Sequence, residues 1–293
     1  MLILHDGNPL KRIRRPWVNH ALIAVAIAVF ILQFTHAMAW RRWAFFPAQL
    51  WHLAPGPGPL YGVAGLVTHQ FLHGSPLHLI ANLVALRVFG DNIEDALGHW
   101  RYALFYLGGG VAAALTQALF GGPNPMIGAS GAISAVMGGY LLLHPRARIL
   151  ILAFNIAPVL APASLVVAFN IAVNIAMAYD VALLTGHAPA AGDAAIAWWA
   201  HIGGFACGLA LVPLLKASSV PLFQAPPPAP ERSMRLLGRF IPSLSWPGDR
   251  PFSEDTAAAV AAVEHPTRAK LMVFAKAGLY VLLLLVLMRF LRS

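Results

Sequence analysis

The sequence contains few charged residues. Only 11% of its 293 residues are Asp, Glu, Lys or Arg, whereas a soluble globular domain carries about a quarter. Acidic residues are the scarcer kind, with 11 against 20 basic ones. This composition excludes an ordinary soluble protein. The 59% of hydrophobic residues instead predicts one polytopic membrane domain, with about 20 residues for each membrane crossing.

Cysteine and the usual metal-binding patterns are also scarce. The single cysteine, Cys207, excludes a disulfide framework within the chain. The zinc-protease pattern HExxH is absent, and we expect neither a metal nor a cofactor. The net charge of +9 would suggest a nucleic-acid ligand in a soluble protein, but in a membrane protein the placement of the charges matters more. We therefore expect no nucleic-acid partner.

What the chain does contain is a series of apolar runs, which predicts an all-α transmembrane bundle. The first run is near 20 residues long, too long for the hydrophobic part of a signal peptide, and indicates an uncleaved helix. The fourth run is short and rich in Gly, so we expect it in the middle of the bundle, shielded from lipid. The runs cover residues 18–38, 75–95, 100–120, 130–144, 158–184, 194–215 and 271–291.

Charge and composition divide the chain into four parts. These are a basic tail (1–16), a membrane domain (17–215), a Pro-rich linker (216–270) and a C-terminal transmembrane helix (271–293). With the N-terminus in the cytoplasm, fourteen of the 20 basic residues fall in cytoplasmic segments, which is the bias expected of a membrane protein.

One pair of charges falls inside a predicted helix. Arg87 precedes Asp91 by one helical turn, a spacing that permits a local ion pair. This spacing favours a structural role for Arg87 over a catalytic one.

Three polar groups are predicted at one depth in the membrane. In this topology the second, fourth and sixth helices all start at the outer face. They begin with His78 and Asn82, with Ser130, and with His201. Each has a structural explanation when taken alone, such as a helix cap for Ser130 or a satisfied core histidine. Polar groups in lipid are costly, however, and their shared depth predicts a common site.

The chemistry that fits these residue types is nucleophilic acyl transfer. A serine hydroxyl attacks only when a base takes its proton, which makes Ser130 the candidate nucleophile and His201 the candidate base. The Ser130 amide, Asn82 and His78 are candidate donors to the oxyanion of the tetrahedral intermediate.

Small residues surround these candidates. Gly128 and Gly131 would let backbone and substrate approach the nucleophile, and Gly204 and Gly208 have the spacing of closely packed helices. The acidic residue nearest His201 in the sequence is Asp193, which belongs to the preceding loop. A Ser-His dyad is therefore more economical than a triad.

Residues 65–215 contain several separate motifs. They are His69, His73, His78 and Asn82; Phe89-Gly90-Asp91-Asn92-Ile93-Glu94-Asp95; Arg101 with Tyr106; the GxSG box at Gly128, Ser130 and Gly131; and Ala200-His201-Ile202-Gly203-Gly204 with Gly208. In their order and spacing these motifs resemble those of the rhomboid family of intramembrane serine proteases.

The resemblance implies a fold, an activity and a location. The fold is a six-helix core with a water-filled cavity open to the outer side, and some members add a seventh helix. The activity is a serine endopeptidase with Ser130 as nucleophile, His201 as base, and His78 and Asn82 in the oxyanion hole. Its partners are transmembrane segments of membrane-protein substrates and the lipid bilayer. A bacterial member would lie in the inner (plasma) membrane.

The sequence departs from the family pattern in two places. Some members carry an aromatic residue four positions after the nucleophile, stacked on the catalytic histidine, whereas this chain has Ser134. The Trp-Arg pair of the first loop has no clear counterpart. His69 and His73 match family positions, and we assign them to cavity hydration or loop structure.

Two other functions remain open from the sequence. A catalytically silent member would bind or retain transmembrane clients, although such members generally lack the Ser or the His. A transporter or metal-binding protein would use His69, His73, His78 and His201 as ligands or proton relays, but such a role does not explain the GxSG box.

Overall fold

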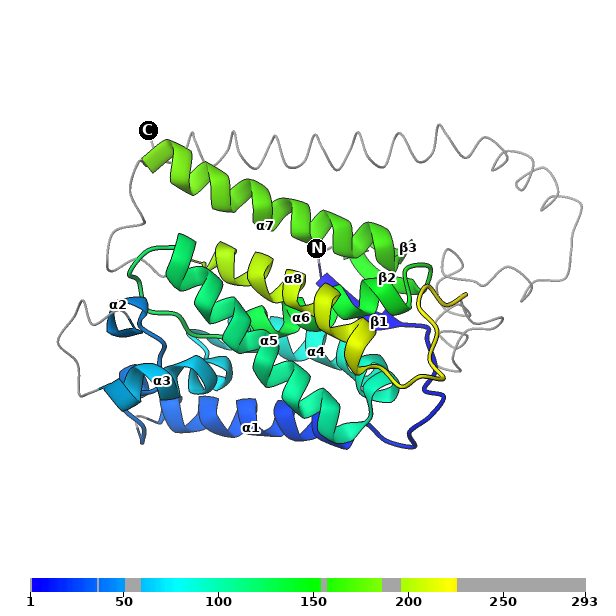
Figure 1. Cartoon of the computed structure of the whole chain (residues 1–293), viewed down its shortest axis with the longest axis horizontal. Helices are drawn as coiled ribbons and strands as arrows, with labels where there is room; N and C mark the ends of the chain where they lie inside the picture. Colours follow the sequence, from blue (N-terminus) through cyan, green and yellow to red (C-terminus); the bar gives the residue numbers. More distant parts are fainter. Residues whose placement is uncertain (1, 36, 51–58, 154–156, 186–195, 226–293) are drawn as a thin grey trace, which may run out of the picture. The chain divides into compact units, whose positions relative to one another are not determined.

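The computed structural model describes residues 2–35, 37–50, 59–153, 157–185 and 196–225 (Figure 1). These residues belong to the first of two compact units, Met1–Met234, and the second unit is Arg235–Ser293. The predicted C-terminal helix at 271–291 and most of the predicted linker lie outside the described residues.

Six long helices form the core of the described part, as the sequence predicts. They are α1 (Trp17–Phe34), α4 (Pro76–Leu97), α5 (His99–Phe120), α6 (Ser130–Leu143), α7 (Ala163–Thr185) and α8 (Trp198–Leu215). The first loop, between α1 and α4, contains η1 (Trp40–Arg42), α2 (Pro47–Leu50), α3 (Pro59–Thr68) and η2 (His69–Phe71). The fold is a helical membrane bundle.

The helices differ in how well they meet the requirements of a membrane crossing. Within the described residues, α1, α5 and α8 are long and apolar enough to span a bilayer, and α6 and the 163–179 part of α7 are shorter apolar helices. Helix α4 is long, but four charged residues lie in its C-terminal half: Arg87, Asp91, Glu94 and Asp95. These charges lower its hydropathy. Arg87 and Asp91 pair with each other within the helix, whereas Glu94 and Asp95 bind other segments.

Helix α6 occupies the middle of the bundle, which confirms the prediction for the fourth run. It packs against α4, α5, α7 and α8, and most of its side chains are buried. Close approach to α8 depends on glycine, because a Cβ at Gly138 would lie 2.5 Å from the Phe205 carbonyl oxygen. A Cβ at Gly208 would lie 2.0 Å from the Ala135 carbonyl oxygen. Small residues thus bring the two helix backbones together.

A three-stranded antiparallel sheet, which the sequence analysis did not predict, covers one end of these helices. It contains β1 (Leu2–Asp6), β2 (Arg148–Ala153) and β3 (Ala157–Pro162) in the order β1-β2-β3. The fifth apolar run was predicted as a helix from residue 158. The start is wrong, because β3 takes the residues up to Pro162 before α7 begins. Figure 1 shows the sheet at the opposite end of the helices from α2 and α3.

Acidic side chains tie the N-terminal segment to α4 at this sheet end. Asp6 accepts hydrogen bonds from the Tyr140 hydroxyl at 2.6 Å and from Asn92 Nδ2 at 2.9 Å. The Asp95 carboxylate accepts from the backbone amides of residues 11, 12 and 13 at 2.7 to 3.1 Å. The segment predicted as a basic tail is therefore bound in place through its backbone.

Glu94 stabilises the start of α1. Its two carboxylate oxygens accept from the Val18 and Asn19 amides at 3.0 and 2.7 Å, and His99 Nδ1 lies 2.5 Å from Oε1. The first amides of a helix have no partner within it, so Glu94 caps α1 from another helix. The predicted local ion pair is confirmed, with Arg87 and Asp91 2.7 Å apart.

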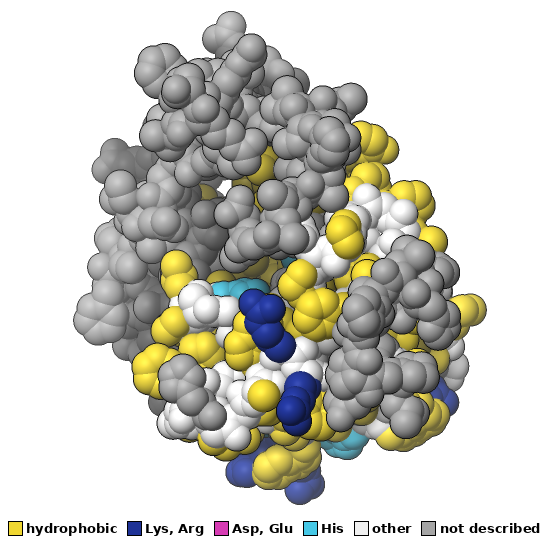
Figure 2. All heavy atoms as spheres, turned by 90° about the vertical axis from the view of Figure 1, so that its left-hand side faces the viewer, with side chains coloured by type: hydrophobic (Ala, Val, Ile, Leu, Met, Phe, Trp, Pro, Cys, Tyr) yellow, Lys and Arg dark blue, Asp and Glu magenta, His cyan; other side chains and the backbone are white. Residues whose placement is uncertain are grey.

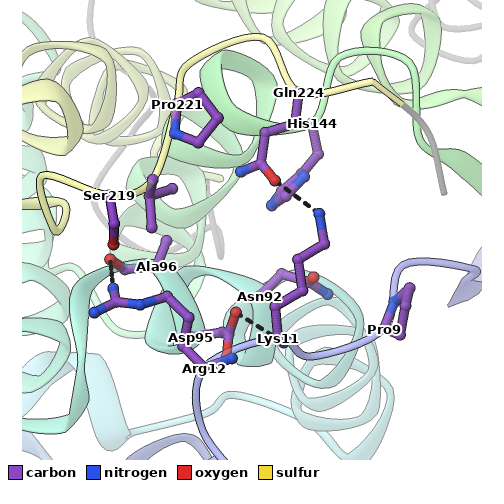
Figure 3. A pocket seen from close by; sticks show the side chains of 11 residues that line it. Pro9, Lys11, Arg12, Asn92, Asp95, Ala96, His144, Ser219, Pro221 and Gln224 are labelled. Atoms are coloured by element: carbon purple, nitrogen blue, oxygen red, sulfur yellow. Dashed lines mark hydrogen bonds between the residues drawn. The ribbon is translucent and has the colours of Figure 1, made fainter.

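A cavity of about 310 Å³ opens at the sheet end, between the N-terminal segment, α4 and the residues after α8. Figure 3 shows Lys11 reaching across it to Gln224, where its Nζ donates to Oε1 at 3.0 Å. Arg12 donates to the Ala96 carbonyl at 3.2 Å. The first residues of the predicted linker are therefore held against the bundle.

Candidate active site

The N-terminal end of α4 places His78. Ser75 is the N-cap residue, and its hydroxyl accepts a hydrogen bond from the His78 amide at 3.1 Å. Pro76 follows at the first helical position, where its fixed φ and missing N–H suit a helix start. The Ser-Pro sequence thus fixes the turn of α4 from which the His78 side chain projects.

Gly128 lies between His78 and Ser130. Its φ of +123° is one that residues with a side chain rarely adopt. A Cβ there would lie 2.8 Å from His78 Cε1 and 3.8 Å from Ser130 Oγ. The predicted glycine therefore makes room for the imidazole and brings it close to the serine.

Ser130 and His201 form a hydrogen bond. Ser130 is the first residue of α6, His201 lies in the first turn of α8, and His201 Nε2 is 2.7 Å from Ser130 Oγ. The residues are 71 positions apart in the sequence. The two helix starts therefore meet at one level, as the sequence analysis expected, in a geometry that suits transfer of the hydroxyl proton to the imidazole.

Asn174 on α7 makes the second contact of the His201 ring. Its Oδ1 atom is a hydrogen-bond partner of His201 Nδ1. The Asn174 Nδ2 donates in turn to the Asn170 carbonyl at 2.8 Å and to Asn170 Oδ1 at 3.1 Å. Asn174 was not among the residues predicted from the sequence. The available signal was the pair of Asn residues one turn apart in the apolar 163–179 part of α7.

Gln117 of α5 fixes the start of α8, and it too was missed. Its Oε1 accepts from the Ala200 amide at 3.2 Å, and its Nε2 donates to the Gly121 carbonyl at 3.3 Å. Ala200 precedes His201 in the first turn, whose amides lack partners within the helix. Gln117 thus helps set the depth of His201.

Asn82 lies one turn after His78 and is buried, with 7% of its surface exposed. Its Nδ2 has no hydrogen-bond partner among the described residues. Most buried donors in proteins are satisfied, so an unpaired one needs an explanation. An amide that is free to donate is what an oxyanion hole requires.

The other two predicted histidines shape the first loop. His69 Nδ1 is 2.7 Å from the Gly65 carbonyl, and the His69 carbonyl accepts from the Gly128 amide at 2.9 Å. The His73 ring packs edge-on against His78 with centroids 5.1 Å apart. Burial lowers the pKa of both His69 and His73 to about 4, so both are neutral at pH 7.

Ser134 does not replace the aromatic residue found in some family members. Its hydroxyl donates to the Ser130 carbonyl at 2.9 Å, one turn earlier on α6. The aromatic neighbour of His201 is instead Trp198, whose ring lies edge-on with centroids 6.0 Å apart. The imidazole is therefore held by Asn174, Ser130 and Trp198.

The remaining predicted glycines serve helix packing. A Cβ at Gly131 would lie 2.5 Å from the Ala113 Cβ, and one at Gly204 would lie 2.0 Å from the Gly131 carbonyl oxygen. Gly131 was expected to let backbone and substrate approach, and in the structure it lets α5 pack closely against α6. Figure 2 views the end where α2 and α3 lie and shows histidine atoms beside a basic side chain and hydrophobic ones.

The fold and this end of the bundle define a class: a polytopic helical membrane protein with polar side chains gathered at the starts of three helices. Residues 60–218 match the Rhomboid domain, and this match covers more than half of the chain. The chain belongs to the rhomboid family.

Relatives in plants and animals support this assignment. RHOMBOID-like protein 4 of Arabidopsis thaliana is 30% identical over 149 residues, covering 50% of this chain and 32% of the relative. RHOMBOID-like protein 1 of the same plant is 26% identical over 67% of this chain and 52% of its own length.

A mitochondrial protein is also similar. The presenilin-associated rhomboid-like protein A of Danio rerio is 31% identical over 29% of this chain and 23% of its own length. The chain therefore spans between about a quarter and half the length of these relatives. They are eukaryotic and do not support the predicted bacterial type or a bacterial inner membrane.

Proposed function

We propose that the chain is an intramembrane serine endopeptidase that hydrolyses peptide bonds in or near transmembrane segments of other membrane proteins. The observation that carries this proposal is the 2.7 Å contact between Ser130 Oγ and His201 Nε2. Membership of the rhomboid family supports it, because intramembrane proteolysis is that family's usual activity.

The first step is acylation of the serine. Ser130 Oγ attacks the scissile carbonyl carbon while His201 Nε2 takes the hydroxyl proton. The carbonyl oxygen becomes an oxyanion, which accepts hydrogen bonds from the Ser130 amide, Asn82 Nδ2 and His78. The Ser130 amide stands at the start of α6, where the helix dipole also favours negative charge.

The second step releases the products. His201 gives its proton to the leaving amine, the C–N bond breaks, and the acyl group stays on Ser130. Water then attacks the ester, its proton passing to His201 and on to Ser130, which releases the carboxyl product. One water is consumed, and the enzyme returns to its starting state.

The substrate class follows from the problem of hydrolysis in a membrane. A helical transmembrane segment hides its carbonyl groups in hydrogen bonds, so the scissile segment must unwind to reach Ser130. Substrates are therefore single-pass proteins with small or helix-breaking residues near their outer end. Substrates would enter laterally, past α7 and the loop at 185–193, and most of that loop lies outside the described residues.

The charge bias supports an orientation in the membrane. With the N-terminus in the cytoplasm, the sheet end lies on the cytoplasmic side and Ser130 lies towards the outer side. Substrates would then be cut near the outer end of their transmembrane segment.

The test is cleavage of membrane-anchored reporters by wild type and Ser130→Ala in the same cells. We expect cleavage by wild type only, together with labelling of wild type at Ser130 by a fluorophosphonate probe. Cleavage retained in Ser130→Ala would remove the nucleophile assignment. Reporters bound but never cut, by a protein that does not label, would indicate the silent client-binding function instead.

A further inference from the structure

A buried amide contacts the His201 ring on the side away from Ser130. Asn174, 5% exposed, presents Oδ1 to His201 Nδ1 from α7, 27 positions earlier in the sequence. The ring is thus contacted at both nitrogens, by α7 on one side and by α6 on the other.

The orientation of this amide is determined by its other hydrogen bonds. Asn174 Nδ2 lies 2.8 Å from the main-chain carbonyl oxygen of Asn170. A carbonyl oxygen can only accept, so the NH₂ group of Asn174 must face it. The Asn174 oxygen is therefore the atom that faces His201, and the orientation follows from the hydrogen-bond network.

The orientation of Asn174 decides the tautomer of His201. An amide oxygen can only accept, so Nδ1 must carry the proton in the neutral ring. Nε2 then has a free lone pair directed at Ser130 Oγ. The hydrogen bonds form one chain. The Ser130 hydroxyl donates to His201 Nε2, His201 Nδ1 donates to Asn174 Oδ1, and Asn174 Nδ2 donates to the main-chain carbonyl of Asn170.

We propose that Asn174 is a positioning residue that keeps the proton of neutral His201 on Nδ1, so that Nε2 accepts the proton of Ser130. This inference rests on the proposed function. It replaces the dyad expected from the sequence with a Ser-His-Asn arrangement, in which the third residue orients the base and touches no substrate.

The uncharged side chain of Asn174 suits a buried position on α7. A carboxylate on an apolar helix would be costly to bury, whereas the Asn174 amide is satisfied within one helical turn. Among the described residues, the polar side chains near the site on the other elements include His78 and Asn82 of α4, with His73 packed on His78, and the uncharged Gln117 of α5.

The experiment measures cleavage of a reporter by purified, reconstituted protein carrying Asn174→Leu, Asn174→Asp or Asn170→Leu. Leucine has a similar volume but no acceptor, so the imidazole can rotate or change tautomer. We expect roughly a 100-fold lower kcat with a KM close to wild type.

Asn174→Asp is the conservative variant. It keeps the acceptor and stabilises the protonated imidazole, so we expect activity close to wild type. The acid limb of its pH profile should move to higher pH by about one unit, because the base must be neutral to act. An unmoved limb would mean that residue 174 does not contact the His201 ring.

Asn170→Leu is the matched control on the same helix face. It removes the 3.1 Å hydrogen bond between Asn174 Nδ2 and Asn170 Oδ1 but keeps the main-chain carbonyl that orients Asn174. Asn170 itself does not touch His201. We expect less than about a threefold change in kcat.

The outcomes separate this inference from the proposed function. If Ser130→Ala is inactive while Asn174→Leu keeps a wild-type kcat, the positioning role is wrong and the protease remains. If Asn174→Leu does not fold, an unshifted acid limb in Asn174→Asp overturns the role by itself. If the wild type neither cleaves nor labels, both proposals fail.

Discussion

The buried polar groups at the two ends of the bundle differ in whether they have hydrogen-bond partners. At the sheet end, the carboxylates of Glu94 and Asp95 each accept several hydrogen bonds from backbone amides. At the Ser130 end, Asn82 Nδ2 and one ring nitrogen each of His69 and His73 are buried without a partner among the described residues. Polar groups whose hydrogen bonds are satisfied stabilise a fold, whereas unsatisfied ones stay available to bind a substrate or water.

This difference predicts that substitutions at the Ser130 end change activity more than stability, and that those at the sheet end do the reverse. The largest expected effect is that of His201→Ala. Loss of the base should lower kcat by at least about 1,000-fold, while the melting temperature changes little. Reporter cleavage and thermal unfolding of the same preparation measure both. A large loss of thermal stability would contradict the comparison.

Glu94→Ala tests the sheet end. Removing the carboxylate leaves the Val18 and Asn19 amides without their acceptor, which should destabilise the protein by about 3 kcal/mol. We expect a lower melting temperature with kcat unchanged at temperatures where the protein is folded. Glu94→Gln keeps one acceptor and should lose about half as much. A lower kcat without a change in melting temperature would break the distinction between the two ends.

Two buried asparagines form a matched pair. Asn82→Ala removes a donor that has no partner among the described residues, and it should lower kcat about 100-fold with little effect on melting temperature. Asn19 donates to the Leu86 carbonyl at 3.0 Å and accepts from Tyr102 at 2.8 Å, so Asn19→Ala should lower the melting temperature and spare kcat. Equal effects of both substitutions on kcat would rule out a special role for Asn82.

The smallest effect is a pH dependence of stability. Burial lowers the pKa of His69 from 6.5 to about 4, so between these values the unfolded chain binds more protons than the folded one. Stability is therefore lost as pH falls, by about 2 kcal/mol for this residue between pH 7 and 5. His69→Gln should reduce the fall in melting temperature over this range. An unchanged pH dependence would mean that His69 does not titrate as described.

Much of the bundle could be predicted because a membrane helix is marked by an apolar run, which is a local property of the sequence. The first six of the seven apolar runs correspond to six helices of the described residues, and the short, Gly-rich fourth run lies in the middle. The sheet was missed because Arg148–Ala153 and Ala157–Pro162 are short apolar segments that a helix pattern absorbs. The central strand β2 also pairs with β1, which is far away in the sequence.

The sequence by itself determined the class of protein, and it predicted a shared level for Ser130 and His201 and candidate residues for acyl transfer. Only the tertiary structure decided which partners these residues have: Asn174 on one side of the imidazole, Ser130 on the other, and none among the described residues for Asn82 Nδ2. The physical reason is that apolar length and helical spacing are local properties. A hydrogen bond between two helices depends on how each is rotated and how deep it lies, and packing of the whole bundle sets both.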